Sequence, residues 1–326
     1  MIYIALLALI MSCVSEPKQS YAIDESAMDD ATALSKQIAK DTLADELYYQ
    51  RAQYYYGEEN YDGAIIDLVK AINIDSSHYQ YYHLLTDACL DYYRSKEAVM
   101  TMERCVELFP DNRPSLLKLS EVYLILKQYD ESQDVVNRLL SRDQQDSEAF
   151  FMLGMNFRAK GEIEKATRAF QTATEIEPEL VDAWIILGQL YEEKGDPLAE
   201  DYYDAAANVN PENIAALHTK AFYLQNNNRI IDAIDLYRKI STIDKNYTDA
   251  YLNCGILYMN LDSISLAYEQ FDIMVKTKLD SPIAYYYRGK TQEALGNLTA
   301  AKSDYTTALS LNPKYTKAQK ALEALQ

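Results

Sequence analysis

Apolar residues recur along most of this 326-residue chain at the spacing of amphipathic helices. The pattern is plainest in residues 147–180, where Phe150, Leu153 and Phe157 lie three and four residues apart. Gly161 interrupts the pattern, and a second amphipathic stretch follows it. Residues 147–180 are therefore predicted to form two helices joined by a tight turn.

Small residues and a proline in the same stretch indicate how the two helices pack and where they stop. Gly154, Ala166 and Ala173 leave room for the helices to approach each other closely. Phe170 follows Ala166 by four residues and supplies bulk on the same helix face. Pro178 ends the second helix, because proline has no backbone N–H to donate. We interpret this stretch as one folding unit.

The same unit returns seven more times, at a spacing of thirty-four residues with one interval shorter by a single residue. The eight repeats are predicted to cover residues 45–78, 79–112, 113–146, 147–180, 181–213, 214–247, 248–281 and 282–315. Each second helix has a small residue at a matching place: Ala64, Ala98, Ser132, Ala166, Ala199, Ala233, Ala267 and Ala301. Four residues later each has a bulky one: Leu68, Met102, Val136, Phe170, Tyr203, Tyr237, Phe271 and Tyr305.

These motifs resemble those of the tetratricopeptide repeat family. The first-helix signature is carried by Trp184, Leu187, Gly188 and Tyr191. The second-helix signature is carried by Ala166, Phe170 and Pro178. A single helix pair buries its apolar side only when a neighbouring pair stacks on it. The resemblance therefore implies an all-α protein: an α-solenoid wound as a right-handed superhelix of eight helix pairs, forming one elongated domain.

The segments outside the repeats have separate predicted roles. Residues 31–44 carry spaced apolar residues and are expected to form an N-terminal helix. Residues 316–326 place apolar residues on one stripe and lysines on the other, as a C-terminal capping helix requires. Residues 13–30 are acidic, have no helical period and are expected to form a flexible tether.

The N-terminus resembles the signal peptide of a bacterial lipoprotein. Residues 2–11 are almost all apolar but too few to span a bilayer, so residues 1–12 are predicted to be a signal peptide. Cys13 follows directly, and the resemblance implies that it is acylated and anchors the protein in the cell envelope, at the outer membrane facing the periplasm. One alternative is an ordinary cleaved signal on a secreted protein. Another is a cytoplasmic protein whose apolar run is a buried first helix.

Charge and residue chemistry narrow the function. A formal net charge of −19 disfavours nucleic acid as a ligand and anionic lipid surfaces as a docking site. The three histidines show no metal-ligand spacing on a helix face, and no phosphate-binding loop or nucleophile elbow is found. We therefore expect no catalytic residues, no metal and no cofactor. Cys89, Cys105 and Cys254 fall at core positions and are expected to be buried.

In the tetratricopeptide repeat family, which this chain resembles, the first helices line the concave side of the superhelix. The side chains at the fifth and ninth places of each repeat point into that concave side. These pairs are Tyr49 and Gln53, His83 and Asp87, Leu117 and Glu121, Phe151 and Met155, Ile185 and Gln189, His218 and Phe222, Leu252 and Ile256, Tyr286 and Lys290. An apolar set lies in the C-terminal half and is expected to be exposed, forming the predicted groove: Phe151, Met155, Ile185, Phe222, Leu252, Ile256 and Met259. The alternative is that helices roll slightly and these side chains pack against the next repeat.

The sequence thus predicts a scaffold that binds an amphipathic helix or extended peptide of a protein partner and performs no chemistry. For an envelope lipoprotein, the resemblance points to assembly, export or secretion. The competing hypothesis is a cytosolic adaptor or an accessory domain of an enzyme complex.

Overall fold

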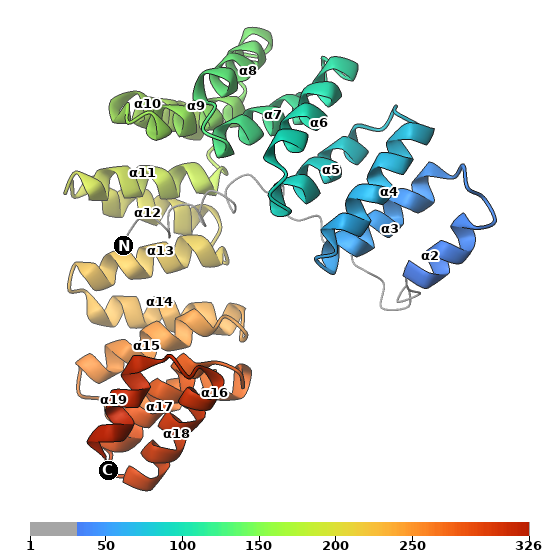
Figure 1. The fold of residues 1–326 in the computed structure, drawn as a ribbon. Coiled ribbons are helices and arrows are strands. Elements are labelled where there is room, and N and C mark those ends of the chain that lie inside the picture. Colours follow the sequence, from blue (N-terminus) through green and yellow to red (C-terminus); the bar gives the residue numbers. More distant parts are fainter. Residues whose placement is uncertain (1–30, 326) are drawn as a thin grey trace. The chain divides into compact units, whose positions relative to one another are not determined.

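The computed structural model describes residues 31–325, and every regular element in this range is an α-helix (Figure 1). The predicted signal peptide, the tether and Cys13 lie outside the described residues. The eighteen helices run from α2 (Ala31–Ile38) to α19 (Thr316–Ala324).

Between these two flanking helices, sixteen helices form the eight repeats. The first helices are α3 (Asp45–Gly57), α5 (Tyr79–Asp91), α7 (Arg113–Ile125), α9 (Ser147–Ala159), α11 (Val181–Glu193), α13 (Ile214–Asn226), α15 (Thr248–Asn260) and α17 (Pro282–Ala294). The second helices are α4 (Tyr61–Ile74), α6 (Ser95–Leu108), α8 (Tyr129–Arg142), α10 (Ile163–Ile176), α12 (Leu198–Val209), α14 (Ile230–Ile243), α16 (Ile264–Thr277) and α18 (Leu298–Leu311). Each first helix begins at the residue where the sequence places the start of its repeat.

The turn inside each repeat has one conformation throughout the chain. A single residue after each first helix adopts a positive φ, which ends the helix in a left-handed turn. Glycine holds this place in three repeats: Gly161, Gly195 and Gly296. A non-glycine residue holds it in the other five: Glu59, Tyr93, Lys127, Asn228 and Asp262. The turn is therefore imposed by the packing of the two helices even where glycine is absent.

The core is built from the recurring small and bulky residues of the second helices. All sixteen of these side chains, from Ala64 and Leu68 to Ala301 and Tyr305, have zero exposed surface. The helices approach so closely that a Cβ on Gly188 would lie 2.5 Å from the ring of Tyr203. The burial predicted for Cys89, Cys105 and Cys254 is confirmed.

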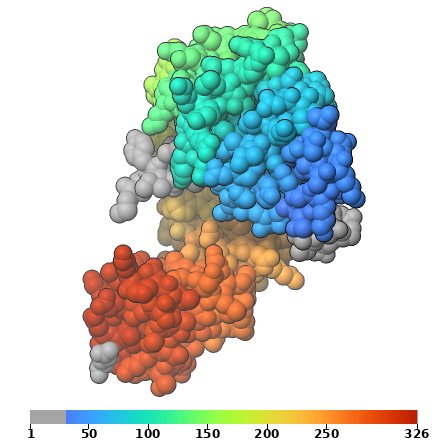
Figure 2. Space-filling view, turned by 45° about the vertical axis from the view of Figure 1, so that its right-hand side comes forward, coloured from blue at the N-terminus to red at the C-terminus, as the bar shows by residue number. Residues whose placement is uncertain are grey.

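The described helices divide into two compact units, with the boundary after Pro178. The first unit holds α2 to α10 and the second holds α11 to α19. Within each unit, every first helix packs against its own second helix, and that second helix packs against the next first helix. Each unit is therefore an α-solenoid of stacked helix pairs. Figure 2 shows the helices of the first unit, blue to green, as a continuous packed mass.

Both flanking helices pack on the repeats, although the N-terminal one is shorter than expected. Helix α2 ends at Ile38 instead of continuing to residue 44, and Leu43 is exposed. Asp41 accepts a hydrogen bond from the backbone N–H of Leu43 (3.0 Å), so the chain turns there. Arg51 of α3 donates a hydrogen bond to Ser35 Oγ of α2 (2.7 Å), which links α2 to the first repeat. At the other end, α19 packs on α18 and buries Ala318.

Candidate functional site

The predicted groove is divided between the two units. Phe151 and Met155 lie on α9 of the first unit. The other five members lie on α11, α13 and α15 of the second unit: Ile185, Phe222, Leu252, Ile256 and Met259. Neither unit therefore contains all seven residues.

The expectation of exposure is wrong for three of the seven residues. Phe151, Met155 and Ile185 are buried, with 3%, 6% and 5% of their surface exposed. The ring of Phe151 packs edge to face on Phe170 of its own repeat, with ring centroids 5.4 Å apart. Ile185 packs with Ala206 and Ala216 in the core. Packing against the next repeat, the stated alternative, is seen for Ile185 through Ala216, whereas Phe151 packs within its own repeat.

The remaining four residues keep exposed surface and lie in two consecutive repeats of the second unit. Phe222 on α13 is 48% exposed, while Leu252, Ile256 and Met259 on α15 are half-buried. We call these four residues the apolar surface.

A hydrogen bond between side chains joins the two helices that carry the apolar surface. Asn253 Nδ2 of α15 donates to His218 Nε2 of α13, at 3.2 Å. His218 and Phe222 are four residues apart and so share one face of α13. Burial lowers the pKa of His218 and so favours its neutral imidazole, which in the tautomer protonated at Nδ1 accepts this bond at Nε2. The bond therefore holds α13 beside α15 with Phe222 on the adjoining turn.

In the second and third repeats the ninth place, held by Phe222 and Ile256 on the apolar surface, carries Asp87 and Glu121 instead. Lys118 Nζ pairs with Asp87 Oδ1 at 2.7 Å. His83 Nε2 lies 2.9 Å from Ser115 Oγ. We call His83, Asp87, Lys118 and Glu121 the charged surface.

Burial perturbs two members of the charged surface strongly. It raises the pKa of Glu121 to about 7, with Lys118 opposing the shift and Asp87 adding to it. It also lowers the pKa of His83 to about 3, and the nearby Lys118 adds to that shift. Near neutral pH the imidazole of His83 is therefore uncharged and the carboxyl of Glu121 is close to half protonated.

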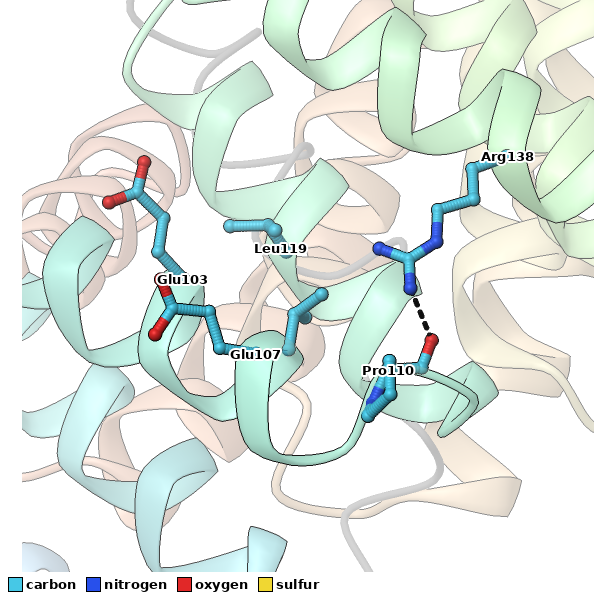
Figure 3. Close-up of a pocket in the computed structure, with 6 residues that line it drawn as sticks. Glu103, Glu107, Pro110, Leu119 and Arg138 are labelled. Atoms are coloured by element: carbon cyan, nitrogen blue, oxygen red, sulfur yellow. Dashed lines mark hydrogen bonds between the residues drawn. The ribbon is translucent and has the colours of Figure 1, made fainter.

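Two hollows among the described residues of the first unit are lined by none of the predicted groove residues. One, of about 560 Å³, is lined by α6, α7 and α8 residues, with Glu103 and Glu107 on one side and Arg138 on the other (Figure 3). Arg138 donates a hydrogen bond to the carbonyl oxygen of Pro110 at 2.6 Å. The other, of about 250 Å³, is lined by α9 and α10 residues, among them Phe150.

Three ionisable residues that the sequence analysis did not combine lie together in the first unit. Asp45, Asp75 and His78 each bring one potential metal-ligating atom to within 4.8 Å of the others. Thirty residues separate Asp45 from Asp75, so the spacing of histidines alone could not reveal the group. The recurrence of the repeat was the usable signal, because it places the start of α3 beside the α4–α5 connection.

No described helix combines the length and the apolar character needed to cross a bilayer.

Sequence profiles described as tetratricopeptide repeat match residues 45–78, 90–153, 151–214 and 282–315, more than half of the chain in total.

Two human proteins are among the relatives with similar sequences. DnaJ homolog subfamily C member 7 from Homo sapiens is 25% identical over 201 residues, covering 56% of this chain and 40% of that protein. Protein O-mannosyl-transferase TMTC1 from Homo sapiens is 24% identical over 204 residues, covering 57% of this chain and 23% of that protein. The chain thus spans less than half the length of these curated relatives.

A solved structure supports the fold. The C-terminal part of a TPR repeat-containing protein from Cytophaga hutchinsonii is 18% identical and superposes with a TM-score of 0.57, covering 75% of this chain and 99% of that one. At this level of identity the likeness concerns the fold alone. Matching profiles, eight recurring helix pairs and a solenoid core together establish the assignment: the chain belongs to the tetratricopeptide repeat family and is a protein–protein interaction scaffold.

Proposed function

We propose that this chain binds an apolar segment of a protein partner on the apolar surface of its sixth and seventh repeats, and performs no chemistry itself. The observation that carries the proposal is the exposure of Phe222, an aromatic ring with nearly half its surface open on a first helix. Leu252, Ile256 and Met259 extend the apolar area on the neighbouring first helix.

Burial of such side chains by a partner is favourable. Removing apolar surface from water contributes about 25 cal/mol per Å². Met259 is flexible and can adapt to partners of different shape. Binding energy in protein interfaces concentrates in a few central side chains, with aromatic residues prominent among them. Phe222 and Ile256 are the natural anchors, because they occupy the same place in adjacent repeats.

Polar groups beside the apolar surface favour a peptide over a purely hydrophobic ligand. Gln225 follows Phe222 by three residues on α13, and its Oε1 is buried without a hydrogen-bond partner among the described residues. Such an acceptor is costly to leave unsatisfied. A backbone N–H group of a bound peptide would satisfy it once the half-buried side chain of Gln225 turned outward.

A peptide selection tests the proposal. Random peptides displayed on phage are selected on the full chain, and the affinity of an enriched peptide is measured by fluorescence anisotropy. We expect amphipathic sequences, and we expect Ile256→Ala to weaken binding at least tenfold. The control is Ile231→Ala, which truncates an exposed aliphatic residue on the second helix α14 of the same unit. Equal affinities for wild type and Ile256→Ala would contradict the proposal.

The proposal includes a location in the cell envelope, with a lipid on Cys13. Its support is the sequence alone, namely the short apolar run that ends just before Cys13. Mass spectrometry of the mature N-terminus should find an acylated Cys13, and Cys13→Ala should release the protein from the membrane fraction. An intact Met1 or an unmodified residue 13 would contradict the anchor. An intact Met1 would favour the cytosolic adaptor or enzyme-accessory role, and an unmodified residue 13 after cleavage would favour a secreted protein with an ordinary signal.

A further inference from the structure

Asp45, Asp75 and His78 converge where three helix ends of the first unit meet. Asp45 is the first residue of α3, Asp75 follows the last residue of α4, and His78 precedes the first residue of α5. His78 Nε2 lies 3.8 Å from Asp45 Oδ2 and 3.5 Å from Asp75 Oδ2. Both separations exceed the length of a normal hydrogen bond.

The same separations suit a shared cation. Nitrogen and oxygen ligands about 2.0–2.2 Å from a tetrahedral Zn²⁺ lie roughly 3.3–3.6 Å from one another. The third separation, between the two aspartate oxygens, is within 4.8 Å, so side-chain rotation can bring all three ligand atoms onto one ion. Two carboxylates with a histidine as their ion-pair partner also carry excess negative charge, which a divalent cation would neutralise.

Each of the three side chains is already oriented by a second contact. The buried Tyr81 donates its hydroxyl to Asp45 Oδ2 at 2.7 Å. The backbone N–H of Ser77 donates to Asp75 Oδ1 at 2.8 Å, which leaves Oδ2 directed at His78. The imidazole of His78 packs on the ring of Tyr81, with centroids 4.9 Å apart. Outer contacts of this kind are what fixes ligands in metal sites.

The turn that holds Asp75 also occurs in another repeat that lacks the histidine. The histidine is therefore not there to form the turn. Asp244 of the sixth repeat accepts a 2.8 Å hydrogen bond from the backbone N–H of Asn246, as Asp75 does from Ser77. Tyr247 stands there in the place of His78. The turn therefore forms without a histidine, and His78 is an addition that the turn does not require.

We propose that Asp45, Asp75 and His78 bind a divalent transition-metal cation of the Zn²⁺ class. An imidazole with two carboxylates is a donor set that Zn²⁺ accepts, with water completing the coordination. The ion would link the start of α3, the end of α4 and the start of α5. It would therefore stabilise the contact between the first repeat and the second. The site is independent of the peptide-binding surface in the second unit.

Titration of the full chain with Zn²⁺ tests the proposal. The chain is first treated with a chelator, and binding is followed by isothermal titration calorimetry. We expect one saturable site in the wild type, with affinity at least tenfold lower in His78→Ala and in Asp75→Asn. Zn²⁺ should raise the melting temperature of the wild type and leave that of His78→Ala unchanged, while both melt alike in chelator because His78 is half exposed.

The matched control is Asp244→Asn, which alters the same turn where no histidine follows and should bind Zn²⁺ like the wild type. Co²⁺ gives a second readout, because its visible absorption bands should appear with the wild type and be lost in His78→Ala. Zn²⁺ binding of equal strength in wild type and His78→Ala, as for an ion held elsewhere on the chain, would overturn the proposal. The absence of any saturable binding to the wild type would also overturn it.

Discussion

The ninth place of the repeat carries opposite chemistry in two pairs of neighbouring repeats, one pair in each unit. In the second and third repeats it holds Asp87 and Glu121, which adjoin Lys118 on the charged surface. In the sixth and seventh repeats it holds Phe222 and Ile256 of the apolar surface. The helices that present these side chains have the same length and begin at the same place in the repeat.

The cores beneath these two surfaces are alike, which shows where the repeat is constrained. The small and bulky residues of all eight second helices are fully buried, whichever unit they belong to. A change at the ninth place leaves that packing intact, so the surface can diversify while the solenoid is retained. Core substitutions should therefore act on stability, and substitutions on the two surfaces should act on binding or on pH dependence.

The largest expected effect is on the shared core. Phe170→Ala removes a fully buried ring from the fourth repeat and should lower the free energy of unfolding by about 3 to 5 kcal/mol. Urea denaturation followed by circular dichroism measures the loss. A loss of less than about 1 kcal/mol is what an ordinary surface substitution costs. Such a small loss in Phe170→Ala would show that the core register is wrong.

An intermediate effect is expected from the charged surface, which should make the free energy of unfolding depend on pH. Because burial raises the pKa of Glu121 to about 7, the folded protein retains a proton that the unfolded chain releases above about 4.5. The free energy of unfolding should therefore fall as pH rises from about 4.5 and level off above about 7. Glu121→Gln removes this effect and should be more stable than wild type at pH 8, by about 1 to 2 kcal/mol, and nearly equal at pH 5.

Urea denaturation of both proteins at the two pH values checks this expectation. The control is Glu175→Gln on α10, an exposed glutamate of the same unit, which should show no such divergence between pH 5 and pH 8. A constant difference between Glu121→Gln and wild type at both pH values would contradict the account of the charged surface.

Salt is expected to have a smaller effect, which is measured on the affinity for a selected peptide. Contacts on the apolar surface are not screened by ions, so affinity for a selected peptide should change less than about threefold between 0.05 and 0.5 M NaCl. Affinity that falls steeply over this range would indicate that the acidic exterior, and not the apolar surface, attracts the partner.

The smallest effect should come from the solvent-facing side of the C-terminal helix. Lys320 is exposed on α19, so Lys320→Ala should change the free energy of unfolding by less than about 0.5 kcal/mol. The same urea titration used for Phe170→Ala measures it. A loss comparable to that of the Phe170 variant would mean that this face of α19 is packed.

Sequence periodicity predicted the helices and the core because both depend on local spacing. Ala166 and Phe170 are buried where the repeat places them, and helix α9 begins at the predicted Ser147. Exposure on the first helices was not predictable from spacing alone. The roll of a helix and the size of its neighbours decide it, so Phe151 is buried on Phe170 while Phe222 remains open.

Two further features depend on contacts between residues far apart in the sequence. The group of Asp45, Asp75 and His78 requires three helix ends to meet, and pairwise spacing does not show this. The division into two units after Pro178 depends on packing throughout the chain, and the repeat pattern continues across it without a change.

The most direct test of the central claim compares one variant from each surface against the same selected peptide. Phe222→Ala should weaken binding by about thirtyfold, the equivalent of about 2 kcal/mol, because it truncates a central aromatic contact. Glu121→Gln should leave the affinity unchanged, because it lies on the charged surface of the other unit. Fluorescence anisotropy of the labelled peptide measures both. Loss of binding in Glu121→Gln together with unchanged affinity in Phe222→Ala would contradict the claim.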